Sequence, residues 1–256
     1  MSQVLVARAY GWAYDAVVDG FEPYERLVDD IARLLDRAAD RDEPSRVVSV
    51  LDVGCGTGTV ARRLARRGYS VVGLDPVGHL AAVARRLSAG TPNVRFFHGD
   101  VARERVPGEG TFDAVVSVSG LYWHPAPRAL LRACRRMLRP GGHAVVVTYA
   151  RPPLVLETMG RMWAAAGPAS AMRALRWLVP TAAFEMARRC ERRYLTERDL
   201  TRALADAGFE VLQCRPAFLA GVSHLAWARA VQPRAEPEEQ DVEAAALGGA
   251  PAGLGG

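Results

Sequence analysis

The stretch Val50-Leu51-Asp52-Val53-Gly54-Cys55-Gly56-Thr57-Gly58 decides the fold expected for this chain. It joins a short β-branched run, Val47–Val53, to a segment with helical character, Thr59–Arg67. A buried strand, a glycine-rich turn and a helix N-terminus together make a site for a small polar ligand. Glycine suits the turn because a Cβ would block both the tight bend and the close approach of a ligand. We therefore expect this site to be lined by Gly54, Cys55, Gly56 and Gly58.

Strand-like and helix-like segments alternate along the chain, which predicts an α/β fold with helices on both faces of a mostly parallel, seven-stranded sheet. The strands expected are Val47–Val53, Ser70–Leu74, Val94–Phe97, Thr111–Ser117, His143–Tyr149 and a closing hairpin of Phe209–Cys214 with Leu225–Val231. Helices are expected over Val4–Val18, Pro23–Ala39, Thr59–Arg67, Gly78–Leu87, Arg128–Leu138 and Thr196–Ala207. In such a sheet the ligand binds at the carboxyl ends of the strands, near the switch point beside the first strand.

Two regions fall outside this alternation. Residues Ala150–Tyr194 carry apolar clusters without a strand pattern, so we expect a helical insertion after the fifth strand, on the ligand side. From Gln232 onward the chain is rich in Glu, Ala, Gly and Pro, and this acidic tail, 232–256, is expected to be disordered. The domain organisation predicted is therefore one domain, 1–231, followed by the tail.

Composition narrows the class of protein. The chain has 256 residues, half of them hydrophobic, and its 33 basic residues are all arginine. Its four cysteines suggest neither a metal site nor a disulfide framework. No signal-like pattern opens the sequence, and the longest apolar region is interrupted by Arg173, Arg176 and Pro180, so no membrane span is expected. We predict a cytoplasmic protein, with a nucleic-acid-binding arginine surface as a disfavoured alternative.

Charge tells which ligand the glycine turn prefers. A dinucleotide fingerprint requires Gly or Ala where this chain has Thr59, and Asp52 would repel a pyrophosphate. The same carboxylate would attract an ammonium or sulfonium group. Asp75 ends the second strand at the distance where an acid meets ribose hydroxyls, and Asp100 follows the third strand, where it can accept a hydrogen bond from an adenine amino group.

The order and spacing of several motifs resemble those of the class I S-adenosylmethionine-dependent methyltransferases: Val50–Gly58, Gly73-Leu74-Asp75-Pro76, Gly99-Asp100, Phe112–Ser117 and Leu138-Arg139-Pro140-Gly141-Gly142. The match covers roughly Val47 to Val147 and is most similar to the small-molecule branch, of the methyltransferase type 11 or quinone-biosynthesis kind. The resemblance implies a Rossmann-like fold and S-adenosyl-L-methionine as cofactor. It implies that the glycine turn holds the methionine part, Asp75 the ribose, and Asp100 with Val101 the adenine.

The remaining site residues follow from the same resemblance and from their places in the chain. Pro76 would lie against the adenine ring, and Ser117 ends the fourth strand among the predicted cofactor contacts. His124, just after that strand, is the candidate general base. Tyr122 and Trp123 would wall the acceptor pocket or pack under the following helix, and Tyr14 would close over the cofactor or pack in a helix core.

The predicted activity is methyl transfer to a small, apolar acceptor at oxygen or carbon. Alignment and a dry site promote such a displacement, which makes the 150–195 insertion a candidate lid, with a docking face for a second subunit as the alternative. N-methylation of a peptide or amine stays open and would be favoured by a pocket acid in place of His124. A non-catalytic S-adenosylmethionine-binding protein and a nicotinamide dehydrogenase are further alternatives. Neither a metal nor a nucleic-acid partner is predicted, and the protein is expected to be a monomer or homodimer.

Overall fold

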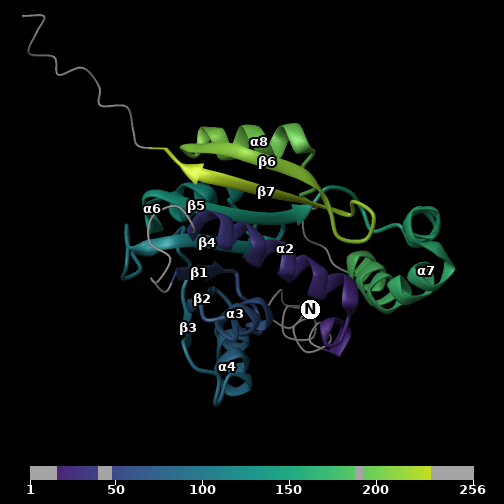
Figure 1. The fold of residues 1–256 in the computed structure, drawn as a ribbon, viewed down its shortest axis with the longest axis horizontal. Coiled ribbons are helices and arrows are strands. Elements are labelled where there is room, and N and C mark those ends of the chain that lie inside the picture. The colour runs from purple at the N-terminus through teal and green to yellow at the C-terminus, as the bar shows by residue number, and fades with distance from the viewer. Residues whose placement is uncertain (1–15, 40–47, 188–192, 232–256) are drawn as a thin grey trace, which may run out of the picture.

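The structure is a computed structural model that describes residues 16–39, 48–187 and 193–231 (Figure 1). Seven strands form one sheet in the order β3-β2-β1-β4-β5-β7-β6. The strands are β1 (Ser49–Val53), β2 (Ser70–Asp75), β3 (Val94–His98), β4 (Phe112–Val118), β5 (Leu138–Tyr149), β6 (Phe209–Ala217) and β7 (Ser223–Ala230). This arrangement confirms the predicted seven-stranded sheet and its closing hairpin.

The pairing is parallel from β3 to β5 and antiparallel around β7. β1 pairs in parallel with β2 and with β4, and β4 pairs in parallel with β5. β7 runs antiparallel to both β5 and β6, with Tyr149 opposite Ser223 and His143 opposite Arg229. The carboxyl ends of the parallel strands therefore meet at one edge of the sheet, as a ligand site in this architecture requires.

Helices cover both faces of the sheet (Figure 1). They are α2 (Glu22–Ala39), α3 (Thr59–Ala65), α4 (Gly78–Leu87), α5 (Gly120–Trp123), α6 (Pro127–Met137), α7 (Val155–Ala187) and α8 (Glu197–Asp206). Alternate side chains of β1, β4 and β5 enter two separate cores, because successive residues of a strand face opposite sides. Val116 packs in the core with α2 and α3, for example, while Val115 packs in the core with α6 and α8.

The described helices follow the predicted segments closely. In α2, the apolar residues at helical spacing, among them Leu27, Ile31 and Leu35, are buried. At α8, the predicted N-cap Thr196 accepts a hydrogen bond from the Asp199 N–H at 3.2 Å, and its hydroxyl donates to the Asp199 carboxylate at 2.7 Å.

Two predictions about local structure were wrong. The fifth strand was expected to begin at His143, but β5 begins at Leu138, because the Pro140-Gly141-Gly142 segment continues the strand through an irregular register opposite Phe112 and Ala114. No helix was expected between the fourth strand and the helix from Arg128, yet Gly120–Trp123 is a single turn of helix. Its brevity leaves no periodic signal in the sequence.

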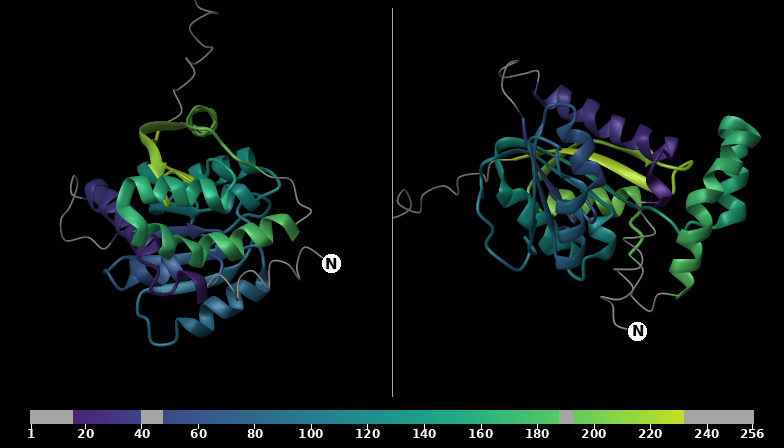
Figure 2. Two further views of the ribbon diagram at one scale, coloured as in Figure 1. Left: turned by 90° about the vertical axis from the view of Figure 1, so that its right-hand side faces the viewer. Right: turned by 90° about the horizontal axis from the view of Figure 1, so that it is seen from below.

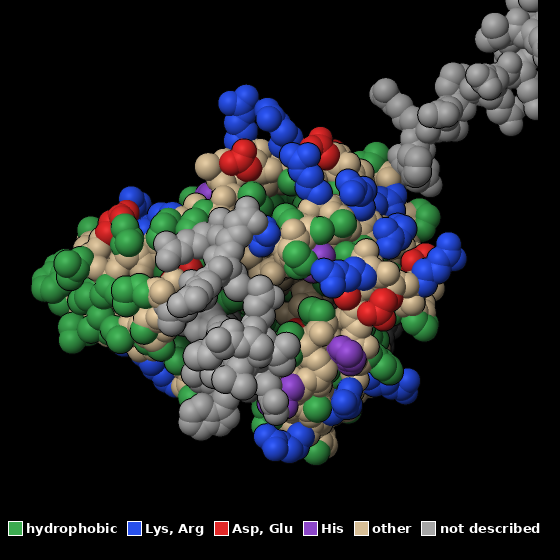
Figure 3. All heavy atoms as spheres, turned by 180° about the vertical axis from the view of Figure 1, so that it is seen from behind, with side chains coloured by type: hydrophobic (Ala, Val, Ile, Leu, Met, Phe, Trp, Pro, Cys, Tyr) green, Lys and Arg blue, Asp and Glu red, His purple; other side chains and the backbone are tan. Residues whose placement is uncertain are grey.

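The predicted insertion is α7, which lies beyond the carboxyl ends of the parallel strands (Figures 1 and 2). It consists of two helical pieces that meet at a kink at Gly167, whose φ is 79°. Five of its large apolar side chains are exposed: Leu156, Trp163, Met172, Val179 and Met186. On the face shown in Figure 3, apolar side chains gather at the end of the molecule where α7 lies. Among the described residues, no helix combines the length and the apolar character needed to cross a membrane.

Some predictions fall outside the described residues. These are most of the leading helix Val4–Val18, with Tyr14 in it, and the tail from Gln232 to Gly256.

Candidate functional site

The predicted ligand residues converge where β1, β2 and β4 end. The chain leaves β1 toward β2 on one side, whereas β4 lies on the other side of β1, so the switch point of the sheet lies between β1 and β4. The Ser117 hydroxyl donates to the Val53 carbonyl at 2.9 Å and ties the two strand ends together. A Cβ placed on Gly54 would lie 3.4 Å from the Gly120 Cα, so the glycine turn and the start of α5 are in contact.

The glycine turn takes a backbone path that favours glycine. Gly54, Gly56 and Gly58 have φ angles of 72°, 56° and 82°. At Gly58 a Cβ would also lie 2.5 Å from the Phe96 ring, whereas at Gly56 nothing lies within 4 Å of it. Gly58 is therefore required by packing, while Gly56 leaves open space above the turn that a ligand can enter.

Asp52 supplies a buried negative charge below this turn. Only 2% of the residue is exposed, and among the described residues its Oδ2 atom has no hydrogen-bond partner. Burial, with the Asp75 charge as a second cause, raises the pKa of the Asp52 carboxyl from 3.8 to about 7, against a hydrogen bond from the Ala61 backbone. A cation bound beside Asp52 would stabilise its ionised form and relieve this cost.

Asp75 holds the turn in its bent path. Its Oδ2 accepts a hydrogen bond from the Gly56 N–H at 2.7 Å, and its Oδ1 accepts one from the Val77 N–H at 2.8 Å. Burial raises the pKa of the Asp75 carboxyl, although these two N–H groups act in the opposite direction. The predicted ribose contact is therefore also the residue that orients the glycine turn.

The predicted general base, His124, lies against Asp100 after β3. Its Nε2 atom is 3.2 Å from both carboxylate oxygens of Asp100, and its Nδ1 accepts a hydrogen bond from the Ala126 N–H at 3.0 Å. Since Nδ1 is the acceptor, the hydrogen-bond network assigns the ring proton to Nε2, which donates to Asp100. Both ring nitrogens are thus engaged within the protein.

The other predicted residues divide into exposed and buried groups. Pro76 and Trp123 have accessible side chains, whereas Val101, with 3% exposed, belongs to the core beside α6 and α8. Ser117 is fully buried, with its hydroxyl turned to Val53. Burial, together with the charges of Asp52 and Asp75, raises the pKa of the Cys55 thiol well above its ordinary value, so this thiol stays protonated.

A polar cluster on the α7 side was not predicted from the sequence. The Tyr122 hydroxyl donates to Glu185 Oε2 at 2.7 Å, and the Tyr194 hydroxyl lies 3.3 Å from the same oxygen. Glu185 is 7% exposed. One signal could have revealed it, because Glu185 is the only acidic residue in the apolar stretch from Trp163 to Ala187.

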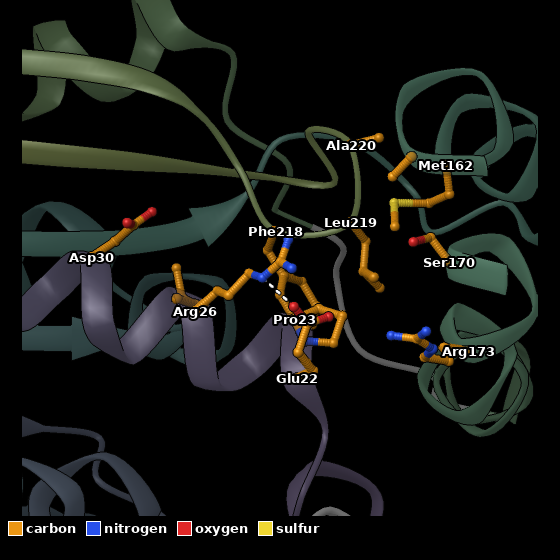
Figure 4. A pocket seen from close by; sticks show the side chains of 12 residues that line it. Glu22, Pro23, Arg26, Asp30, Met162, Ser170, Arg173, Phe218, Leu219 and Ala220 are labelled. Atoms are coloured by element: carbon orange, nitrogen blue, oxygen red, sulfur yellow. Dashed lines mark ion pairs between the residues drawn. The ribbon is translucent and has the colours of Figure 1, made fainter.

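A groove lies between the middle of α7 and the N-terminal half of α2 (Figure 4). It has a volume of about 200 Å³ and is also lined by the β6–β7 turn; its residues include Arg26, Met162, Arg173 and Leu219. The groove lies along one side of α7, which is consistent with an element that is only partly packed on the sheet.

The donor set at the glycine turn fits the cationic cofactor that the resemblance implies. Two buried carboxylates, Asp52 of β1 and Asp75 of β2, interact electrostatically, and Asp75 holds the N–H of Gly56, whose Cβ position is open. A sulfonium and an ammonium group would be attracted there, whereas a pyrophosphate would be repelled. Among the described residues, no group of three or more histidine, cysteine, aspartate or glutamate side chains is arranged to hold a metal ion.

Comparison with known proteins agrees with this geometry. A family model described as "Methyltransferase domain" matches residues 21–214. The ubiquinone biosynthesis O-methyltransferase of Pseudomonas paraeruginosa is 38% identical over 108 residues, which are 41% of this chain and 46% of that protein. The chain thus spans about half the length of the curated relatives it matches.

Solved structures share the fold at low identity. The magnesium protoporphyrin IX methyltransferase (ChlM) of Synechocystis PCC 6803, determined with bound SAH, has a TM-score of 0.55 at 18% identity, covering 81% of this chain and 84% of that one. The cyclase SpnF has a TM-score of 0.54 at 21% identity, covering 78% and 81%. Since a cyclase appears among these neighbours, the fold by itself does not determine the reaction.

Proposed function

The chain belongs to the methyltransferase-domain family, and on that premise we propose that it transfers the methyl group of S-adenosylmethionine to a small-molecule acceptor. The acceptor is apolar and is methylated at oxygen or carbon. The activity named for the quinone-biosynthesis relatives supports this choice of acceptor class. Roughly half of those relatives' length is matched, so the proposal rests chiefly on the site.

The observation that carries the proposal is the buried oxygen Oδ2 of Asp52, which has no hydrogen-bond partner among the described residues. Leaving an ionised oxygen buried in this way costs roughly 1–3 kcal/mol or more unless a cation compensates for it. Asp52 lies in β1, two residues before the glycine turn, and its charge interacts with that of Asp75, which accepts a hydrogen bond from the Gly56 N–H. A ligand with a sulfonium and an ammonium group supplies the missing charge, and a dinucleotide does not.

When bound, the cofactor supplies an electrophilic methyl group on a positively charged sulfur. The protein positions that group: Asp75 fixes the bend of the glycine turn, and Asp52 attracts the cationic end. Asp100 and Pro76 receive the adenine. Displacement is favoured by alignment and by exclusion of water, because charge is lost as the methyl group moves.

We assign the role of lid to α7, which lies over the carboxyl edge and is separated from α2 by the groove. The alternative role for α7 is a docking face for a second copy of the chain, and its exposed apolar side chains support that alternative. The monomeric or homodimeric state, the cytoplasmic location and the absence of a nucleic-acid partner remain predictions, as do the single domain 1–231 and its tail.

Calorimetry tests the cofactor assignment directly. S-adenosylmethionine and S-adenosylhomocysteine are expected to bind in the micromolar range, and Asp75→Ala is expected to weaken both. NADH serves as the control ligand. Tight NADH binding without S-adenosylhomocysteine binding would overturn the proposal in favour of a dehydrogenase.

A further inference from the structure

Glu185 is the centre of a small hydrogen-bonded cluster that joins three distant parts of the chain. Tyr122 comes from α5, Glu185 from the last turn of α7, and Tyr194 from the segment before α8. Both tyrosine hydroxyls approach the same oxygen, Glu185 Oε2, at 2.7 Å and 3.3 Å. The two hydroxyls lie 3.4 Å apart. The cluster is thus one carboxylate with two phenols directed at it.

The two hydrogen bonds differ in strength and in access to solvent. The Tyr122 contact has the length of a strong O–H···O bond, while the Tyr194 contact is longer than such bonds normally are. Tyr122 is fully buried, and Tyr194 is partly exposed. Tyr122 therefore holds the carboxylate in place, and Tyr194 occupies a position that another hydroxyl can take.

The cluster lies on the acceptor side of the switch point. Tyr122 follows Gly120, which contacts the glycine turn at Gly54. Its ring also packs edge-on against Tyr149, the last residue of β5, with centroids 4.7 Å apart. The Leu195 N–H donates to the Tyr149 carbonyl at 3.0 Å, which fixes Tyr194 at the same strand end. The carboxylate is thus at the carboxyl edge, beside β4 and β5, whereas the adenine residues lie beside β2 and β3.

The two phenols that contact this carboxylate belong to a larger group of packed aromatic rings. Tyr122 contacts Trp123 edge-on at 5.5 Å and Tyr194 at 5.4 Å, and Tyr149 lies 6.1 Å from Trp177 of α7. Aromatic walls suit a flat apolar body, and a carboxylate at one end suits a hydrogen-bond donor on that body.

We propose that Glu185 is the general base of the methyl transfer and that the acceptor it serves is an aromatic compound with a free hydroxyl group. This inference rests on the proposed function. The acceptor hydroxyl takes the place of the Tyr194 hydroxyl at Glu185. As the acceptor oxygen forms its bond to the methyl carbon, the carbon–sulfur bond breaks and its electron pair stays on sulfur. The acceptor proton moves to the carboxylate, so the products are a methyl ether, a neutral thioether and a carboxylic acid.

The assignment moves the proton acceptor from His124, which follows α5, to Glu185 on α7. From the sequence, a pocket acid in place of His124 was expected to favour N-methylation, but the two groups directed at Glu185 in the structure are hydroxyls, which favours a hydroxyl acceptor. The amine probe below tests the N-methylation alternative. In the structure, His124 Nε2 donates to Asp100 and its Nδ1 is occupied by the Ala126 N–H. Glu185 instead belongs to α7, the candidate lid, and in the structure it already accepts the hydrogen bond of Tyr122 at the carboxyl edge.

The test uses 4-hexylphenol as acceptor probe and 4-hexylaniline as its matched amine, with methyl-labelled S-adenosylmethionine. The wild-type protein is expected to methylate the phenol and to prefer it to the amine. Glu185→Gln is expected to lower kcat by about 10²–10⁴-fold, the range for loss of a general base, with S-adenosylhomocysteine affinity unchanged. Glu157→Gln is the control, since Glu157 is an exposed glutamate on the same helix, paired with Arg151 and Arg161.

Binding provides a second measurement that does not depend on turnover. With S-adenosylhomocysteine saturating, 4-hexylphenol is expected to bind Glu185→Gln about tenfold or more weakly than wild type, from loss of a charge-assisted hydrogen bond. Tyr194→Phe, which keeps the carboxylate, is expected to bind the phenol at least as tightly as wild type. This variant decides the question if Glu185→Gln does not fold.

Several results would overturn the inference while leaving the proposed function intact. They are cofactor binding without binding or methylation of the phenol, preferential methylation of the amine, and a Glu185→Gln variant with wild-type phenol turnover. Loss of phenol binding in Tyr194→Phe would also overturn it. Failure of the wild-type protein to bind S-adenosylhomocysteine would instead contradict the proposed function itself.

Discussion

The imidazole of His124 and the carboxylate of Asp100 link two loops at the carboxyl edge of the sheet. Nε2 lies at the same distance, 3.2 Å, from both carboxylate oxygens. The contact spans the segment after β4 and the segment after β3, on opposite sides of β1. His124 is therefore placed to position Asp100, the predicted adenine contact.

His124→Ala is accordingly expected to raise the Kd for S-adenosylmethionine by about ten- to a hundredfold, the range expected for loss of one hydrogen bond to a charged partner. At saturating cofactor, kcat should stay close to the wild-type value. Steady-state kinetics with both substrates varied separates the two effects. His124→Gln, which can still donate to Asp100, should restore part of the affinity. A large fall in kcat with unchanged Kd would instead support the general-base role predicted for His124.

Asp52→Asn is expected to increase the stability of the protein at pH 8 and to weaken cofactor binding. The folded-state pKa of Asp52 is about 7, against an ordinary 3.8, so folding is disfavoured by its ionisation and wild-type stability falls as the pH rises from about 4 to 7. Asparagine does not ionise. We expect this variant to be more stable than wild type at pH 8, by roughly 4 kcal/mol at most. Urea unfolding at pH 4 and pH 8 measures this. A variant less stable than wild type at pH 8 would contradict the buried charge.

Cofactor binding should depend on pH through the same carboxyl group. A cationic ligand favours ionised Asp52, so below pH 7 binding must release a proton from it. We expect wild-type affinity to fall as the pH drops from about 7, with a limiting slope of about tenfold per pH unit. Calorimetry in buffers of different ionisation enthalpy would detect the released proton. The slope should be absent in Asp52→Asn, and its persistence there would assign the proton to another group.

Gly56→Ala and Gly58→Ala form a matched pair of single-methyl substitutions. Both residues have positive φ, so each substitution carries a backbone cost of about 1 kcal/mol. Gly58→Ala adds a clash with Phe96, 2.5 Å from the new Cβ, and should lower the melting temperature much further. Gly56→Ala has room for its Cβ and should fold, but should bind S-adenosylhomocysteine poorly. Thermal melts measure the loss of stability, and calorimetry measures the affinity for S-adenosylhomocysteine. Unchanged affinity in Gly56→Ala would show that the ligand does not occupy the space beside Gly56.

The parallel part of the fold could be predicted because its signals are local. Glycines and acids follow each buried strand at fixed offsets, as at Asp52, Asp75 and Asp100, and the strand pattern gives the order of elements. The start of β5 was misjudged because Pro140-Gly141-Gly142 usually ends an element, whereas here the partner strand accommodates it with a change of register.

The acceptor side could not be predicted in the same way. Tyr122 and Glu185 are 63 residues apart, and Tyr194 lies 72 residues from Tyr122, so their contact depends on how α7 folds back over the sheet. The large apolar side chains of α7 are not confined to one face, since Trp177 is buried and Trp163 is exposed, so the pattern gives no direction for any one side chain. His124 was identified by its place after β4, but its partners are visible only in three dimensions.

The antiparallel direction of β7 has a practical consequence for handling the protein. Ser223 pairs with Tyr149 at the ligand edge, whereas Arg229 pairs with His143, six residues back along β5 and roughly 20 Å away at the usual rise of a strand. The described chain therefore leaves the sheet from the edge remote from the glycine turn. Tethering the protein to a sensor surface through a group attached beyond Val231 should leave the cofactor and acceptor entrances facing the solution.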